Sequence, residues 1–390
     1  MHSLVIHNGL LCDHQGEIRA DLRIQDGIIT EISPSIVTAE KNSLDASNLI
    51  ILPACIDLNI QITNCSQSNL TLLQEKAKRG GVGTIALNTS MHEAEFLQFF
   101  NTQSQITFAS SAIPWMDNKI QEISKMRHQQ ALAISIQSST PSHALKYIYD
   151  YAKFLNLSCI CSLTHHLGGV SVESENSFKM GLSHIPPFIQ EMEFSKFFCL
   201  ANAYKIPTLL QALSEEKLFN QTLDTPWIQN EISIHHLLLN EERIFTYDPW
   251  AKITPPLTTQ HTQEFFLDQI SKIDMLTSLY REFSTSSKEQ TFEDASSGVD
   301  CLDFYFPLLF TELVKSRRLT LSELSAKTSF NQAKFLHINA GEISRGKKAD
   351  LIIIDPNQSF EISHPLYGKR ELFGSIKAFF SHKTGLHKIS

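Results

Sequence analysis

Residues 51–57 have the sequence Ile-Leu-Pro-Ala-Cys-Ile-Asp, a short apolar run that ends in a carboxylate. A run of this length and composition is typical of a strand buried on both faces, as parallel strands are. Further short apolar runs follow it, separated by longer segments that include helical apolar periods at 70–79, 142–154, 187–203 and 264–271. We predict eight strands, at 51–57, 84–87, 106–109, 132–136, 158–161, 208–211, 231–234 and 273–276. Eight strands alternating with helices over roughly 280 residues predict an α/β fold of the (β/α)₈ barrel type.

The two ends of the chain have a different pattern. Residues 1–52 alternate apolar and polar positions, with turn signals at Asn8-Gly9 and Asp26-Gly27. Residues 339–390 alternate in the same way, in ADLIIIDP and FGSIKAFFSHKTGLHKI. Neither end is large enough for a core of its own. We therefore predict that residues 1–52 and 339–390 pair into one small composite β-sandwich, and that the barrel spans 53–338.

Composition excludes several classes of function. The formal net charge of −8, with no basic block, argues against a nucleic-acid partner. No apolar run approaches the ~20 residues of a membrane span, and the N-terminus lacks the pattern of a signal peptide. The seven cysteines, an odd number, favour a reducing compartment over a disulfide framework. We expect a cytoplasmic protein without a membrane partner.

Several segments, in the right order along nearly the whole chain, resemble dihydroorotases of the cyclic amidohydrolase superfamily. They are the strand at Ile51–Leu58, the turn Gly80-Gly81-Val82-Gly83-Thr84, the segment His235-His236-Leu237-Leu238-Leu239, the pair of motifs Tyr247-Asp248-Pro249 and Pro255-Pro256-Leu257, the run Pro307–Leu313, and the closing block Gly341–Pro356. The resemblance implies a zinc-dependent hydrolase of cyclic amides, whose metal lies at the C-terminal mouth of the barrel. Zinc lowers the pKa of bound water to about 7 and so supplies hydroxide at neutral pH.

The metal ligands that this resemblance implies are replaced. The family's H-x-H after the first strand corresponds to Asn59-Ile60-Gln61, and carboxamide oxygens are weak, neutral zinc donors. The family's later histidines fall on Ile160 and near Ala212, and its aspartate, which is also the general base, falls on Ser278. The bridging carboxylate or carboxylated lysine would lie in Ser135–Thr140, which contains neither. We predict no metal, no cofactor and no catalytic residue at these degenerate former-ligand positions.

Substrate-holding positions depart from the family pattern as well. The arginine after H-x-H corresponds to Thr63, and an asparagine of the family falls on Ser90. The residues that flank Pro255-Pro256-Leu257 are Thr254 and Thr258, where the family has asparagine and arginine.

Other polar residues could in principle rebuild a site. Cys159 and Cys161 with His165-His166 form the one Cys/His cluster of interest, but side chains alternate along a strand, so both cysteines face the helices if Ile160 faces inward. His235 and His236 match the family without being its ligands, which favours a structural pair. Asp57 is expected to accept hydrogen bonds from backbone groups at the barrel mouth.

Three functions remain open. The resemblance to members that lack zinc ligands implies a pseudoenzyme: a structural or regulatory subunit for aspartate carbamoyltransferase of pyrimidine biosynthesis, assembling with it, with itself, or both. The second is an active cyclic amidohydrolase with a rebuilt site that uses Cys161, His165 or His166. The third is a metal-free sensor of a pyrimidine intermediate.

Overall fold

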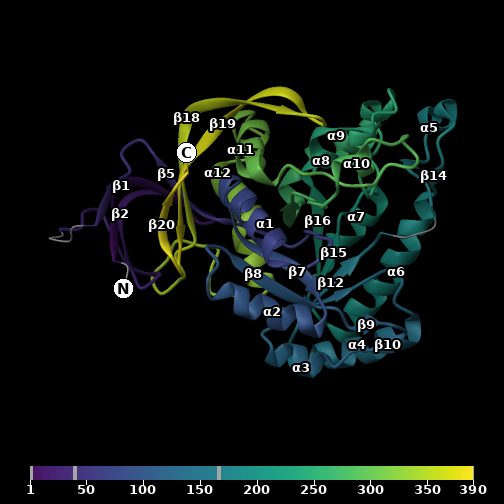
Figure 1. The fold of residues 1–390 in the computed structure, drawn as a ribbon, viewed down its shortest axis with the longest axis horizontal. Helices are drawn as coiled ribbons and strands as arrows, with labels where there is room; N and C mark the ends of the chain where they lie inside the picture. Colours follow the sequence, from purple (N-terminus) through teal and green to yellow (C-terminus); the bar gives the residue numbers. More distant parts are fainter. Residues whose placement is uncertain (1–2, 38–41, 165–167, 390) are drawn as a thin grey trace.

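A parallel barrel forms the larger part of the computed structural model, which describes residues 3–37, 42–164 and 168–389 (Figure 1). Its strands are hydrogen-bonded in parallel, each to the next along the chain. They are β6 (Cys55–Asp57), β7 (Val82–Thr89), β8 (Thr107–Ala112), β11 (Ala133–Ile136), β12 (Ser158–Ser162), β15 (Thr208–Gln211), β16 (Ile228–Ser233) and β17 (Met275–Thr277). The predicted (β/α)₈ barrel is confirmed.

Helices cover the outside of the barrel (Figure 1). They are α1 (Gln67–Arg79), α2 (Met91–Asn101), α3 (Ile123–His128), α4 (Ser142–Leu155), α5 (Glu175–Met180), α6 (Pro187–Tyr204), α7 (Glu216–Thr222), α8 (Ile234–Leu238) and α9 (Gln260–Asp268), followed after the last barrel strand by α10 (Thr285–Lys288), α11 (Tyr305–Leu309), α12 (Leu321–Ser325) and α13 (Asn331–Phe335). In α1, Ser66 caps the first turn and Leu70, Leu73 and Ala77 form the buried stripe. Among the described residues, no helix combines the length and the apolar character that a membrane span requires.

The barrel closes between its first and last strands through a side chain. Asp57, the last residue of β6, accepts hydrogen bonds from the Thr277 hydroxyl at 2.7 Å and from the Ser278 amide at 2.8 Å. Beyond the strand ends, the Gln61 amide donates to the Tyr280 carbonyl at 2.9 Å, and the Glu282 amide donates to the Gln61 carbonyl at 2.9 Å. The carboxylate therefore joins β6 to β17 where no strand ladder does so in the described chain.

Strands from both chain ends share one sheet, in the order β20-β19-β18-β5-β1-β2-β3, with β4 beside β1. They are β1 (Leu4–Asp13), β2 (Gly16–Gln25), β3 (Ile28–Ser33), β4 (Ser43–Asp45), β5 (Ile50–Pro53), β18 (Leu351–His364), β19 (Gly368–Ser381) and β20 (Gly385–Lys388). The sheet wraps around a separate apolar core that includes Ile6, Leu22, Ile51, Ile353 and Phe380. This confirms the composite sandwich built from both termini; its exact boundary with the barrel stays a prediction.

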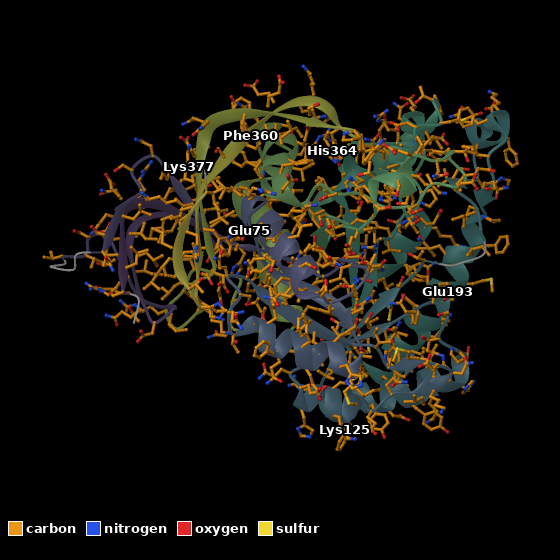
Figure 2. The ribbon with its side chains drawn as sticks, viewed as in Figure 1. Glu75, Lys125, Glu193, Phe360, His364 and Lys377 are labelled. Carbon is orange, nitrogen blue, oxygen red and sulfur yellow. The ribbon has the colours of Figure 1, made fainter. Side chains whose placement is uncertain are left out.

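The β18–β19 hairpin also ties the sheet to the barrel. Figure 2 labels Phe360 and His364 along its first strand, with His364 on the side of the barrel. The His364 ring nitrogen Nε2 donates to the carbonyl of Asp300 at 2.9 Å, in the loop that follows β17. The two parts of the molecule are thus joined at β5–β6 and again at this hairpin.

Several predicted strand boundaries were wrong, and two of these differences have a clear physical reason. The predicted strand at 51–57 is divided between the two parts: the Ala54 amide still donates to Asp350 of the C-terminal segment, whereas the Cys55 amide donates to Gly81 of the barrel. The predicted strand at 231–234 is instead β16, Ile228–Ser233. It ends there because the Ser233 hydroxyl accepts hydrogen bonds from the next amides and caps α8.

Candidate functional site at the barrel mouth

A cavity of about 480 Å³ opens at the carboxyl ends of the barrel strands. In barrels of this kind the loops after the strands build the active site. Most of the side chains that line it are polar. The lining residues are Gln61, Gln137, Ser162, Thr164, Gly168, Gly169, Ile185, Thr254, Arg281 and Ser297. Ser162 ends β12, and Gln61 and Arg281 follow the first and last strands. The cavity is therefore the candidate site.

Arg281, which lines this cavity, belongs to a hydrogen-bond network that continues through the buried Asn59 near the β6–β17 junction. Arg281 Nη2 donates to Asn59 Oδ1 at 2.6 Å, and Nη1 donates to the carbonyls of Asn59 at 2.8 Å and Tyr280 at 3.0 Å. Asn59 Nδ2 in turn donates to Glu231 Oε1 at 2.6 Å. The carboxamide of Asn59 thus has both ends engaged, by a cation on one side and a carboxyl group on the other.

Glu231 lies fully buried beneath this network, on β16. Burial, followed by the neighbouring charge of Asp57, raises its pKa from 4.5 to about 8, against the lowering effects of Asn59 and Arg281. Its Oε1 also accepts a hydrogen bond from the Ala212 amide at 3.2 Å. Burial lowers the pKa of Arg281 to about 10, so this side chain stays a cation at neutral pH. The mouth therefore holds a fixed positive charge and a largely protonated Glu231.

The predicted former-ligand positions do not all gather at one point. Asn59 and Ser278 meet around Asp57, which accepts a hydrogen bond from each backbone amide, at 3.0 Å and 2.8 Å. Ala212 joins only through its backbone, at a left-handed φ of 51°. Gln61 is exposed and lines the cavity. Ile160 lies deeper, in the apolar cluster that fills the barrel interior.

Of the predicted substrate-holding positions, Thr254 is the one that lines the cavity, beside a cis peptide bond to Pro255. Thr63 is held at the rim, where its amide and hydroxyl donate to Glu282 at 2.6 Å and 2.9 Å. Ser90 is used as the N-cap of α2, in a capping box with Glu93. Thr258 is buried, and its carbonyl accepts a hydrogen bond from the Glu241 amide.

The zinc centre that the family resemblance implies does not fit these residues. Zinc sites use imidazole, thiolate or carboxylate donors, and here an isoleucine and an alanine side chain supply no donor atom at all. The Asn59 carboxamide is already engaged at both ends. The guanidinium of Arg281, held against Asn59, would repel a divalent cation placed there.

His235 and His236 form a satisfied structural pair. The Nε2 atom of His235 donates to the Ser278 carbonyl at 2.9 Å, while its Nδ1 accepts from the Tyr367 hydroxyl at 2.7 Å. His236 Nε2 donates to the Pro256 carbonyl at 3.0 Å, and its Nδ1 accepts from Ser233 at 2.9 Å. Burial lowers the pKa values of the two imidazoles to about 3 and about 4. Both rings are neutral and fully used by the fold.

Cys159 and Cys161 face the helices and not the barrel interior. They lie in the core between strands and helices, where Cys161 Sγ is 3.7 Å from the Tyr149 hydroxyl of α4. Burial raises the pKa of the Cys161 thiol to about 12, which makes it a poor nucleophile or ligand. His165 and His166 lie outside the described residues. Within residues 3–37, 42–164 and 168–389, no group of three His, Cys, Asp or Glu side chains is placed to hold a metal ion.

Comparison with known proteins places this site in context. Residues 291–383 match the model of the amidohydrolase family. A probable dihydroorotase-like protein of Helicobacter pylori is 28% identical over 385 residues, covering 96% of this chain and 95% of that protein. The dihydroorotase of Acetivibrio thermocellus is 26% identical over 367 residues, covering 88% and 86%. The chain is therefore similar over most of its length to a dihydroorotase-like protein and to a dihydroorotase.

Solved structures with the same fold include two cyclic-amide hydrolases. The L-hydantoinase (dihydropyrimidinase) of Arthrobacter aurescens superposes with a TM-score of 0.88 at 18% identity, over 99% of this chain and 96% of that one. The dihydropyrimidinase of Brevibacillus agri has a TM-score of 0.83 at 15% identity, over 98% and 95%. At these identities the likeness concerns the architecture, barrel and sheet together.

Sequence reasoning missed the two residues that organise the mouth, Glu231 and Arg281. A signal was present for each: a glutamate inside an otherwise buried strand, and an arginine three residues after Ser278. Neither had an apparent partner, because Asn59 precedes them by 172 and 222 positions in the chain. The barrel topology alone brings the three together.

Proposed function

We propose that this protein is a non-catalytic dihydroorotase homologue of the cytoplasm that serves as a structural or regulatory subunit for aspartate carbamoyltransferase in pyrimidine biosynthesis. One observation supports the first half of the proposal, that the protein is non-catalytic. The Arg281–Asn59–Glu231 network occupies the mouth with hydrogen bonds that hold the barrel together. The similarity to a probable dihydroorotase-like protein over 96% of this chain, and to a dihydroorotase over 88%, supports the link to pyrimidine biosynthesis. The choice of aspartate carbamoyltransferase as the partner is what the family resemblance implies.

The geometry argues against hydrolysis of a cyclic amide at this mouth. Such hydrolysis needs an activated water and a general base beside the scissile bond. Ser278 offers a neutral hydroxyl where the family resemblance implies an aspartate. Glu231, whose raised pKa would suit a general base, does not line the cavity, and its Oε1 is engaged by Asn59 and Ala212. Purified protein should therefore interconvert dihydroorotate and carbamoyl aspartate no faster than the buffer does.

Metal content and activity test the non-catalytic half together. Elemental analysis of protein purified without added metal is expected to find well under one zinc per chain. A stoichiometric zinc that chelators remove, with dihydroorotate turnover that disappears on its removal, would establish the competing function, an active amidohydrolase with a rebuilt site.

The partner half is tested in the cell that makes this chain. Deleting the gene should lower aspartate carbamoyltransferase activity in the extract and shift that activity to a smaller size in gel filtration. Complementation with the wild-type gene, and with a Gln61→Ala variant altered only at the cavity wall, should restore both. Unchanged activity and unchanged size after deletion would refute the subunit role and leave the non-catalytic half standing.

A further inference from the structure

A second cavity, of about 190 Å³, lies at the opposite end of the barrel from the mouth. Thr84 and Thr107 line it near the amino ends of β7 and β8, and α2 supplies a further wall. The terminal sheet and the segment leading into it contribute Lys348, Asp350 and His382. Figure 1 shows α2 and β8 on the side of the barrel that faces this sheet. The cavity is therefore at the junction of the two parts of the molecule, whereas barrel enzymes carry their active sites at the carboxyl ends of the strands.

Several polar groups in this lining are not used by the fold. Within the described part of the chain, the Lys348 ammonium group and the carboxamides of Gln98 and Gln130 have no hydrogen bond or ion pair. His382 uses Nδ1, which is 2.8 Å from both carboxylate oxygens of Asp350, while its Nε2 has no partner among the same residues. With Asp350 accepting from Nδ1, a doubly protonated His382 ring would donate from Nε2. The cavity thus gathers unused hydrogen-bond donors from separate elements.

The charges at this cavity favour an anion. Asp350 is the one carboxylate in the described lining; it is buried, and the backbone amide of His382 also donates to it, at 3.0 Å. Two ammonium groups lie nearby, Lys348 in the lining and Lys383 behind Asn101, to which Lys383 donates at 3.0 Å. Burial lowers the pKa of Lys383 to about 8; the charge of Asp350 opposes this effect, and the charge of Lys348 adds to it. An anion in the cavity would relieve the repulsion between these two ammonium groups.

The size of the cavity and the spread of its donors favour a phosphate group. A volume of about 190 Å³ is below that of most sites for larger organic ligands, so the cavity suits a small ion. Donors that approach from several elements suit the tetrahedral oxygens of phosphate better than the two coplanar oxygens of a carboxylate. Lysine commonly binds phosphate as a point charge, without the paired donors of arginine.

We propose that this junction cavity binds a phosphate group, as the free ion or as a small monoester, with Lys348 and His382 as its main contacts and Gln98 and Gln130 as further donors. The proposal goes beyond the subunit role and does not depend on it, because neither the barrel mouth nor a partner protein takes part.

Calorimetric titration of the full chain tests the proposal, in a buffer without phosphate or sulfate and at constant ionic strength. Inorganic phosphate should bind once per chain with a dissociation constant in the millimolar range or below, and acetate at least about tenfold more weakly. Glycerol 3-phosphate distinguishes the two sources of the phosphate group: tighter binding than inorganic phosphate supports a monoester, and weaker binding supports the free ion. The proposal is overturned if phosphate does not bind at millimolar concentration, or if acetate binds equally well.

Variants locate the binding. Lys348→Gln changes an exposed side chain that has no hydrogen bond in the described chain, so the fold should persist while phosphate binds at least about tenfold more weakly. Gln98→Glu, also at an exposed position, keeps the shape of the side chain but adds a repelling carboxylate, and should abolish binding. The matched control is Lys272→Gln, which removes an exposed lysine just before β17 and should leave binding unchanged. Binding that survives both cavity variants, or that all three variants weaken equally, would refute this site.

Discussion

Replacing Glu231 by glutamine should stabilise the protein at neutral and alkaline pH. At pH 7 the buried side chain is largely protonated, because its pKa is raised to about 8. Its Oε1 accepts from Asn59 and Ala212, which leaves Oε2 to carry the proton. Glutamine has the same shape, with a carbonyl oxygen for the two donors and an NH₂ group where the O–H lies. The substitution therefore preserves the hydrogen bonds and removes the carboxyl group, which ionises in the unfolded chain at neutral pH.

The magnitude follows from proton linkage. Below pH 4.5 the side chain is protonated in both the folded and the unfolded chain, so its titration does not change the free energy of unfolding. Between 4.5 and about 8 the unfolded chain has lost the proton while the folded chain keeps it, so the free energy of unfolding falls as pH rises. The loss is about 1.4 kcal/mol per pH unit. From pH 5.5 to pH 7.5, Glu231→Gln should therefore gain about 3 kcal/mol relative to wild type.

Urea denaturation followed by circular dichroism at several pH values measures this difference, and Glu371→Gln, at an exposed site on β19, is the matched control that should show no such trend. The reasoning is refuted if Glu231→Gln loses several kcal/mol by the same amount at every pH. That result would mean that Glu231 is ionised throughout and paired with Arg281, since breaking a buried ion pair costs about 3–5 kcal/mol.

Three further outcomes are expected. Asp57→Ala removes the acceptor of the Ser278 amide and the Thr277 hydroxyl at the barrel junction, and should lower the free energy of unfolding by about 3 kcal/mol or more in urea titrations. His235→Ala should cost about 2–4 kcal/mol at pH 7. It should also flatten the loss of stability as pH falls below 6.5, because the buried neutral ring, with its pKa near 3, stays unprotonated where the unfolded chain binds a proton. Restoring the family's ligands at once should not yield an efficient zinc hydrolase in a dihydroorotate assay, and efficient turnover would show that the pocket is otherwise intact; the five changes are Asn59→His, Gln61→His, Ile160→His, Ala212→His and Ser278→Asp.

The architecture could be predicted because it depends on patterns that are local in the sequence. Short apolar runs separated by helical periods specify a parallel barrel, and alternation at both termini specifies the strands that share one sheet. Strand boundaries were harder to predict where the backbone changes its hydrogen-bond partner without a change in amino-acid composition. Pro53, Ala54 and Cys55 belong to one apolar run, yet the hydrogen bonds pass from the terminal segment to the barrel within it.

The sequence allowed the positions of several mouth residues to be predicted, but not the contacts that they make. Landmark motifs sufficed to place Asn59 and Ser278 at the mouth, and strand alternation was enough to turn Cys159 and Cys161 away from it. The role of Arg281 depends on side-chain contacts across the barrel junction, between residues more than 200 positions apart. No periodicity in a single sequence encodes such a contact.

These contacts also explain why the predicted former-ligand positions cannot be considered one at a time. Asn59 bonds to Arg281 and to Glu231, so returning a histidine at 59 would leave a guanidinium and a buried carboxyl group without their partner. An aspartate at 278 would bring a second carboxylate to the neighbourhood of Asp57, whose charge already raises the pKa of Glu231. Each single reversal thus costs stability before it gains a ligand. The contacts of Asn59 at this mouth therefore contribute to the stability of the fold, which is what the proposed non-catalytic role requires.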